Sequence, residues 1–219
     1  MRKVRLLYKK TGRAVYISHL DIMRTFQRTL TRAGVAVKHT EGFNPHPYIS
    51  IALPLSLGYG GECEFLDMVI MDDMSSADIV SKMNAVMPEG IVVECAYENA
   101  RPVRDIAYSE FHILFEYDNG LPLGVIKKLK DLFAGDEIIV LKKSKRGEAD
   151  ANIAPLIKAF DVSVDGESLK ATAVLAAGNT SLNPEYIVRA IEKYLPDCKP
   201  DFAEITRTNV FDEKLCEFR

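Results

Sequence analysis

The chain contains 219 residues, of which 47% are hydrophobic and 27% are charged, and its formal net charge is −3. Such a chain can bury one large core or two cores of about 100 residues each, and no apolar stretch approaches the roughly 20 residues of a membrane-spanning helix. The basic N-terminus has no signal-peptide segment, so we expect a cytoplasmic location and no membrane partner.

The first half of the chain predicts the element order β-α-β-β-α-β. Residues 3–10 alternate as a strand that places Val4, Leu6 and Tyr8 on one side. Residues 18–34 predict a helix, because Ser18 and Asp21 form a capping box and Gly34 can end the helix in the left-handed conformation. Further strands are expected at 35–39, 47–55, 63–71 and 90–97, and a second helix at 75–87. This order, with a long insertion between the middle strands, is the ferredoxin-like arrangement.

The pattern is repeated after a short linker at residues 101–107. Strands are expected at 108–117, 137–143, 168–177 and 202–211, and helices at 122–133 and 183–195. Asn183 and Pro184 suit the start of the last helix, whereas residues 146–162 fit poorly and are interpreted as an insertion. We therefore predict an α+β fold of two tandem ferredoxin-like (βαββαβ) halves, with domains at 1–100 and 108–219.

Positive charge is concentrated near the start of the chain. Residues 1–48 carry ten basic and two acidic side chains, whereas the remaining residues carry 18 basic and 29 acidic ones. A second basic cluster consists of Lys142, Lys143, Lys145 and Arg146. This segregation indicates either a surface for a polyanion or a solvated basic face.

Three arginines of the first predicted helix are spaced four residues apart, so Arg24, Arg28 and Arg32 form one stripe along it. The opposite side is expected to pack on the sheet, through Leu20, Met23, Phe26, Leu30 and Ala33. The step of about 6 Å between the arginines approximates the phosphate spacing of a nucleic-acid strand. The stripe therefore either binds phosphates or consists of surface arginines whose stems pack down.

The stretch EGFNPHPYIS, residues 41–50, is stiffened by two prolines that hold Asn44 and His46 extended. Such a loop loses little entropy when a ligand binds, and His46 could stack on a base, donate to a phosphate or transfer a proton. Nearby tyrosines at positions 16, 48 and 59 could also stack on bases. The alternative is a rigid crossover that only starts the next strand.

Neither a metal nor a cofactor is expected. The candidate ligands His19, Asp21, His39, Glu41 and His46 show no recognised metal-ligand spacing. The four cysteines, at positions 63, 95, 198 and 216, are far apart, so a zinc site or an iron–sulfur cluster held by this chain alone is not expected, and free thiols are. Dinucleotide-binding, Walker and G-x-S-x-G motifs are missing from the sequence.

Residues 16–58, YISHLDIMRTFQRTLTRAGVAVKHTEGFNPHPYISIALPLSLG, resemble the uncharacterised radical-SAM-linked domain. That domain occurs alone or fused to the C-terminus of cobalamin-type radical-SAM proteins. Its pattern of Y-I-S-H-L-D, R-R-A-G, S-E-G-F-N-P-H-P and A-L-P-L is met here with TRAG at 31–34 and TEG at 40–42. The second half resembles the family more weakly, at 151–157 and 203–211. The resemblance implies an accessory role in modifying a macromolecule such as ribosomal or transfer RNA.

These features favour an RNA-binding accessory protein that works with a separate radical-SAM protein. The expected RNA-binding residues are Arg24, Arg28, Arg32, His19, Asn44, His46, Tyr48, Lys142, Lys143, Lys145 and Arg146. The tandem halves also look like RNA-processing proteins of CRISPR systems, so a metal-independent RNA endonuclease using His19 or His46 as general acid or base is an alternative. A module that docks the radical-SAM partner is another.

Overall fold

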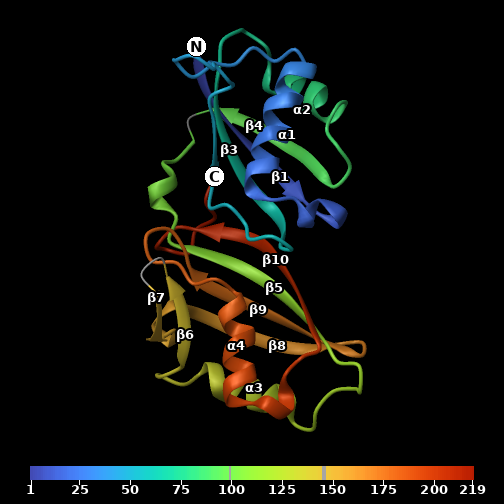
Figure 1. Cartoon of the computed structure of the whole chain (residues 1–219), viewed down its shortest axis with the longest axis vertical. Coiled ribbons are helices and arrows are strands. Elements are labelled where there is room, and N and C mark those ends of the chain that lie inside the picture. The colour runs from blue at the N-terminus through green and yellow to red at the C-terminus, as the bar shows by residue number, and fades with distance from the viewer. Residues whose placement is uncertain (99, 145–146) are drawn as a thin grey trace. The chain divides into compact units, whose positions relative to one another are not determined.

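A computed structural model describes residues 1–98, 100–144 and 147–219. The chain divides into two compact units, Met1–Val103 with Arg219, and Arg104–Phe218 (Figure 1). Each unit has a four-stranded antiparallel sheet with two helices. The predicted α+β class with two ferredoxin-like halves is therefore confirmed.

The first unit contains β1 (Arg2–Lys10), η1 (Gly12–Tyr16), α1 (His19–Arg32), β2 (Ile49–Ala52), β3 (Gly60–Ile70), α2 (Ser76–Asn84) and β4 (Ile91–Glu98). Its strands are antiparallel and lie in the order β4-β1-β3-β2. Both helices lie on the same face of this sheet (Figure 1). The two crossovers of a β-α-β-β-α-β chain produce this arrangement.

The core of the first unit lies between its sheet and its helices. Alternate residues of β1 point into it, and Val4, Leu6 and Tyr8 are at most 2% exposed. From α1 the core receives Phe26, whose ring meets that of Tyr8 edge-on with centroids 4.8 Å apart. The alternate residues of β1 and the apolar side of α1 thus pack together in one apolar layer.

The start and end of α1 are set by local sequence. The Ser18 hydroxyl accepts a hydrogen bond from the Asp21 backbone N–H and donates one to the Asp21 carboxylate. Gly34 follows the helix with a φ of 66°, which a residue with a Cβ rarely adopts. Both features confirm the predicted helix boundaries.

Residues 35–39 do not form the predicted strand. They make isolated bridges, in which Val37 pairs with Ile70 and His39 with Pro47. Val35 and Val37 are nevertheless buried, at 5% and 6% exposure. The segment lies against β3 for only a short distance, because the Lys38 N–H donates to the Val69 carbonyl and the Met71 N–H to the Ala36 carbonyl, both at 2.8 Å. The apolar alternation therefore reflects packing against the core together with one isolated bridge to β3, and not a full strand.

The second unit contains β5 (Tyr108–Glu116), α3 (Val125–Phe133), β6 (Ile139–Ser144), β7 (Gly147–Asn152), η3 (Ala154–Leu156), β8 (Ile157–Asp165), β9 (Ser168–Ala176), α4 (Glu185–Tyr194), η4 (Pro196–Cys198) and β10 (Phe202–Phe211). A further turn, η2 (Val103–Asp105), precedes β5. The four sheet strands lie in the order β10-β5-β9-β8, and all their pairings are antiparallel.

The assignment of the second strand in this unit from sequence is wrong. Ile139–Ser144 and Gly147–Asn152 form β6 and β7, a separate two-stranded antiparallel sheet that precedes the sheet strand in the chain and is drawn beside α4 in Figure 1. The sheet strand is instead β8, at Ile157–Asp165, and its first six residues belong to the stretch 146–162 that was interpreted as an insertion. Because β8 is the edge strand beside β9 and has a single buried residue, Val162, its apolar pattern is weak.

Candidate nucleic-acid interface

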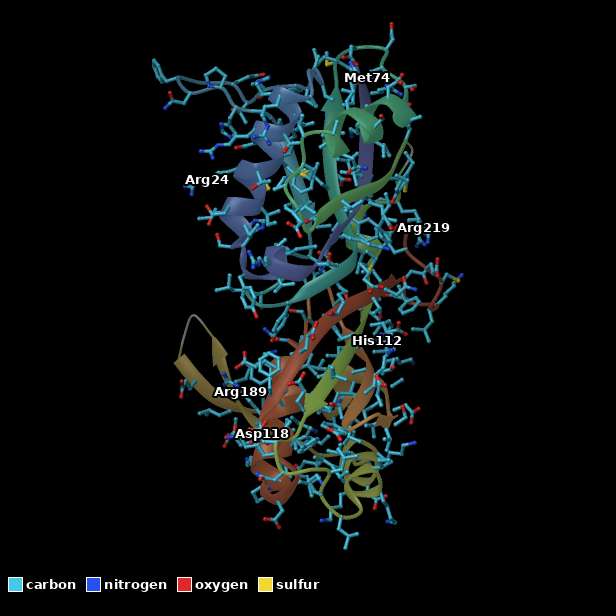
Figure 2. All side chains as sticks on the ribbon, turned by 90° about the vertical axis from the view of Figure 1, so that its right-hand side faces the viewer. Arg24, Met74, His112, Asp118, Arg189 and Arg219 are labelled. Atoms are coloured by element: carbon cyan, nitrogen blue, oxygen red, sulfur yellow. The ribbon has the colours of Figure 1, made fainter. Side chains whose placement is uncertain are left out.

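The arginine stripe lies on the solvent side of α1. Arg24, Arg28 and Arg32 are all exposed, whereas Ile22, Phe26 and Leu30 are at most 3% exposed. Figure 2 shows Arg24 pointing outward from the helix. The helical period therefore separates an apolar face from a cationic one within the same 14 residues.

The three guanidiniums differ in what they bind within the protein. Arg24 Nη1 lies 3.0 Å from Asp21 Oδ1, and Arg32 Nη2 donates to the Val86 carbonyl oxygen at 2.8 Å. Arg28 makes no hydrogen bond or ion pair within the described part of the chain. The pKa of Asp21 is lowered by its bond from Ser18 and by the charges of Arg24 and Arg28.

Leu20 was expected to pack on the sheet, and this expectation is wrong. Its side chain is 65% exposed. Leu20, Arg24 and Gln27 are spaced i, i+4 and i+7 and share a helix face, so Leu20 lies beside the arginine stripe. Met23 and Ala33, from the same predicted apolar set, are partly buried against the core.

The proline-rich stretch forms a narrow loop next to α1. The Thr40 N–H donates to the His46 carbonyl at 2.9 Å, and the Tyr48 N–H donates to the Lys38 carbonyl at 2.8 Å. Gln27 Nε2, on α1, donates to the Pro47 carbonyl at 3.5 Å. The loop projects on the side to which Arg24 points (Figure 2).

His46 is oriented by its own loop. Its Nδ1 lies 3.2 Å from Thr40 Oγ1 and 3.1 Å from the Asn44 carbonyl oxygen, and its backbone N–H donates to Thr40 Oγ1 at 3.2 Å. The imidazole is exposed, as is Asn44, and neighbouring Phe43 is fully exposed at 107%. These hydrogen bonds involve Nδ1 and orient the ring, and Nε2 takes part in neither of them.

The remaining expected RNA-binding residues are divided between the two units. His19 is the first residue of α1 and is exposed, and Tyr48, at the end of the loop, is 55% exposed. Lys142 lies in the second unit, where its Nζ donates to the Ser181 carbonyl at 3.2 Å. Lys145 and Arg146 lie outside the described residues, as does the side chain of Lys143. The structure thus brings the helix and loop residues together in the first unit.

A pocket of about 740 Å³ in the first unit was not predicted. Its lining includes Lys3, Arg5, Tyr48, Asp67 and Arg101. The sequence contained one signal for this pocket, namely a charged residue within each of two apolar strands: Arg5 in β1 and Asp67 in β3. Cross-strand pairing places these two charges opposite each other, which the sequence does not show.

Other chemical features of the described residues are few. No group of three or more His, Cys, Asp or Glu side chains in residues 1–98, 100–144 and 147–219 could hold a metal ion. Free thiols are present at Cys63, Cys95, Cys198 and Cys216, and Cys198 alone among these four is buried. Within the same described ranges, no helix is both long and apolar enough to cross a membrane.

Comparison with known proteins gives similarity in fold and one family match. A chain of the "Crystal Structure of a Cbf5-Nop10-Gar1 Complex" is 13% identical, with a TM-score of 0.50. A chain of the "Crystal structure of the archaeal box H/ACA sRNP Nop10-Cbf5 complex" is 11% identical, with a TM-score of 0.47. The alignments cover 96% and 93% of this chain but only 50% and 46% of those chains.

The first of these similarities supports the α+β fold and nothing further, because the identity is low. A search of curated proteins finds no match. A family match extends over residues 3–184, which include all of the first unit except its first two residues and Arg219. The chain therefore belongs to the family described as "Uncharacterized protein conserved in bacteria (DUF2344)".

Proposed function

We propose that this protein binds RNA through α1 and the loop at 38–48, and that it presents ribosomal or transfer RNA to a separate radical-SAM enzyme in the cytoplasm. The observation that carries the proposal is the row of three exposed arginines beside a preformed loop. Guanidinium groups are well suited to phosphate, because they offer several N–H donors in a fixed plane.

The arginine row favours a polyanion over a small anion. Successive side chains at four-residue intervals are about 6 Å apart along the helix, which suits contacts with consecutive phosphates. The row also lies within residues 1–48, which contain ten basic and two acidic side chains. A protein surface with this charge attracts RNA at long range and loses much of that attraction in salt.

The loop supplies the groups that contact bases. Phe43 and Tyr48 are exposed aromatic side chains, on which unpaired bases can stack. His46 is held by Thr40 and Asn44, so its ring is already oriented before RNA arrives. Stacking requires unpaired nucleotides, and we therefore expect single-stranded or looped RNA to bind better than a continuous duplex.

The radical-SAM part of the proposal rests on the resemblance of residues 16–58 to the radical-SAM-linked domain. The enzyme would be a separate polypeptide that supplies the iron–sulfur cluster. Co-purification of a radical-SAM enzyme with the tagged protein, lost when the RNA is digested, would support an RNA-bridged assembly.

The test of RNA binding is a salt titration with a matched pair of triple variants. If about five phosphates are contacted, affinity should fall roughly 100- to 500-fold between 50 and 200 mM salt. Arg24→Gln, Arg28→Gln and Arg32→Gln together should weaken binding and lower the slope of log affinity against log salt by about two to three. The control removes the same charge from α3, by Lys127→Gln, Lys128→Gln and Lys130→Gln, and should bind as the unchanged protein does.

An affinity that does not respond to salt, or equal losses in both triple variants, would contradict the proposed interface. Cleavage of structured RNA in the presence of EDTA, abolished by His46→Ala, would show a nuclease instead of an accessory protein. Binding without cleavage supports the accessory role.

A second candidate function is docking of a protein partner, and one observation favours it. Tyr16, Leu20 and Leu57 of the first unit are 63–70% exposed, and the bond from the Gly58 N–H to the Val15 carbonyl brings the segment with Leu57 beside the one with Tyr16 at the start of α1. Apolar side chains gathered at a surface often mark a protein interface. Pull-down of the radical-SAM enzyme that survives both nuclease treatment and the arginine triple variant would favour this function over RNA binding.

A further inference from the structure

We propose that the pocket in the first unit binds one nucleotide, with the base against Tyr48 and the phosphate near Lys3 and Arg101. The source of that nucleotide rests on the proposed function: it would be an unstacked nucleotide of the bound RNA. The pocket itself is argued from its own geometry.

The pocket lies on the face of the sheet opposite the helices. Side chains alternate along a strand, and Val4, Ile49 and Met68 point into the core. Their neighbours in β1, β2 and β3 must therefore point to the other face. These neighbours are Lys3, Arg5, Tyr48, Ser50, Asp67 and Val69, and all six line the pocket.

The floor of the pocket is a rigid ion pair. Arg5 Nε and Nη2 donate to the two oxygens of Asp67 at 2.6 and 2.8 Å, and Arg5 Nη1 donates to the Arg101 carbonyl at 2.8 Å. The Arg5 side chain is 3% exposed, whereas that of Asp67 is 39% exposed. The buried guanidinium thus neutralises Asp67 and fixes it, while the carboxylate stays within reach of a ligand.

These contacts also tie the wall of the pocket to its floor. Residues 100–103 line one side, and the bond from Arg5 to the Arg101 carbonyl holds that segment over β1. Burial lowers the pKa of Arg5, but the hydrogen bonds and charge of Asp67 more than compensate and raise it. Arg5 therefore stays charged, and the floor does not change over the physiological pH range.

Size and charge both fit a nucleotide. The volume of about 740 Å³ lies within the range of 300–1,000 Å³ typical of small-molecule sites. Four basic side chains line the pocket, Arg2, Lys3, Arg5 and Arg101, against two acidic ones, Asp67 and Glu98. The surplus of positive charge favours an anion, and the Ser50 hydroxyl and Asp67 carboxylate can bond the hydroxyls of a sugar.

Tyr48 connects the pocket to the proposed RNA path. It follows Pro47, whose carbonyl accepts the bond from Gln27 of α1, and its own N–H is bound to Lys38. Its ring is 55% exposed and belongs to the pocket lining. RNA held by the arginine row can therefore pass the loop at the β2 edge of the sheet and place one base on this ring.

The test uses the whole protein and measures binding of 5′-mononucleotides, inorganic phosphate and a short single-stranded RNA. Tyr48→Ala should weaken binding of the mononucleotides and of the RNA about tenfold, the usual effect of losing one stacked base. Phe202→Ala is the matched control, because Phe202 is an aromatic residue of the second unit whose exposure, 54%, matches that of Tyr48, and it does not line the pocket. Lys3→Gln should weaken binding of the mononucleotides and of the RNA, whereas Lys128→Gln should change neither.

Each outcome is decisive for the pocket. The inference is overturned if Tyr48→Ala binds mononucleotides as tightly as Phe202→Ala does, or if inorganic phosphate binds as well as a mononucleotide. RNA binding that depends on the arginines but not on Tyr48 would sink the pocket and leave the proposed function intact. Mononucleotide binding without RNA binding would support the pocket and contradict the proposed function, and it would identify a free nucleotide as the ligand.

Discussion

At the scale of single residues, the most consequential pair is Arg5 and Asp67. An arginine buried in a β-sheet is costly unless its N–H groups are bonded. Here three of its donors reach Asp67 and the Arg101 carbonyl, so the charge is compensated in place. The pair also lines the pocket in which we propose that a nucleotide binds, so stability and the shape of the pocket depend on the same two side chains.

Removing Asp67 should leave an uncompensated buried cation. We expect Asp67→Ala to lower the free energy of unfolding by about 2–3 kcal/mol, somewhat less than for a fully buried pair because the carboxylate is partly exposed. Urea unfolding of Asp67→Ala, Arg5→Met and the double variant measures this. A loss of stability in the double variant equal to the sum of the two single losses would contradict the coupling of the two side chains.

The environment of Tyr117 predicts how the free energy of unfolding changes at high pH. Its hydroxyl donates to the Cys198 carbonyl at 3.0 Å, and burial raises its pKa to about 12. Below pH ~10 the phenol is protonated in both folded and unfolded chains. As the pH rises toward about 12, the unfolded chain loses the proton first, so this contribution to stability is lost.

The measurement compares Tyr117→Phe with the unchanged protein in urea unfolding at several pH values. At pH 8 the variant should be less stable by about 1 kcal/mol, because one hydrogen bond is missing. That difference should shrink above pH ~10. A constant difference up to pH 12 would contradict the pKa shift.

At the scale of elements, α1 and its following loop form one functional segment. The Ser18 cap and Gly34 fix the length of the helix, and that length places three arginines in one row. The loop then returns beside the helix through the bond between Gln27 and Pro47. Prolines at 45 and 47 restrict the loop before anything binds.

Replacing both prolines should weaken RNA binding without removing a side chain that contacts RNA. We expect Pro45→Ala with Pro47→Ala to reduce affinity roughly tenfold, because a more flexible loop must be ordered on binding. Pro122→Ala with Pro196→Ala is the control pair in the second unit. Filter binding or fluorescence anisotropy measures the effect, and equal affinity of the two double variants would refute the role of loop stiffness.

The hairpin of β6 and β7 shows how an element can be assigned to the wrong place. Its first strand, β6, begins with an apolar run in which Val140 is buried, at 1% exposure, whereas β7 is polar and mostly exposed. The sheet strand β8 has a weaker pattern because it lies at an edge and buries little. Local periodicity reports burial, and burial does not say which sheet a strand belongs to.

At the scale of the whole molecule, two ferredoxin-like units follow one another along the chain. We propose that residues 1–100 and 108–219 are separate domains joined by 101–107. The basic surface and the pocket both belong to the first unit, so RNA binding should depend mainly on it.

Limited proteolysis tests this division. Trypsin should cut first after Arg104 in the linker, because segments between domains are more accessible than sheets and helices, and because the bond after Arg101 precedes Pro102 and resists trypsin. Mass spectrometry of the early fragments identifies the cut. First cleavage within a strand of either sheet would contradict the proposed domain boundaries.

The sequence alone determined the α+β class, the boundaries of α1, the buried face of β1, most of that of α1, and the arginine row. Each of these depends on neighbours within a few positions, through capping, left-handed glycine or periodicity. The pairing of β8 with β9 and the pocket around Arg5 and Asp67 were decided only by the tertiary structure. They depend on which strands become neighbours, because cross-strand contacts join residues such as Arg5 and Asp67 that are far apart in the chain.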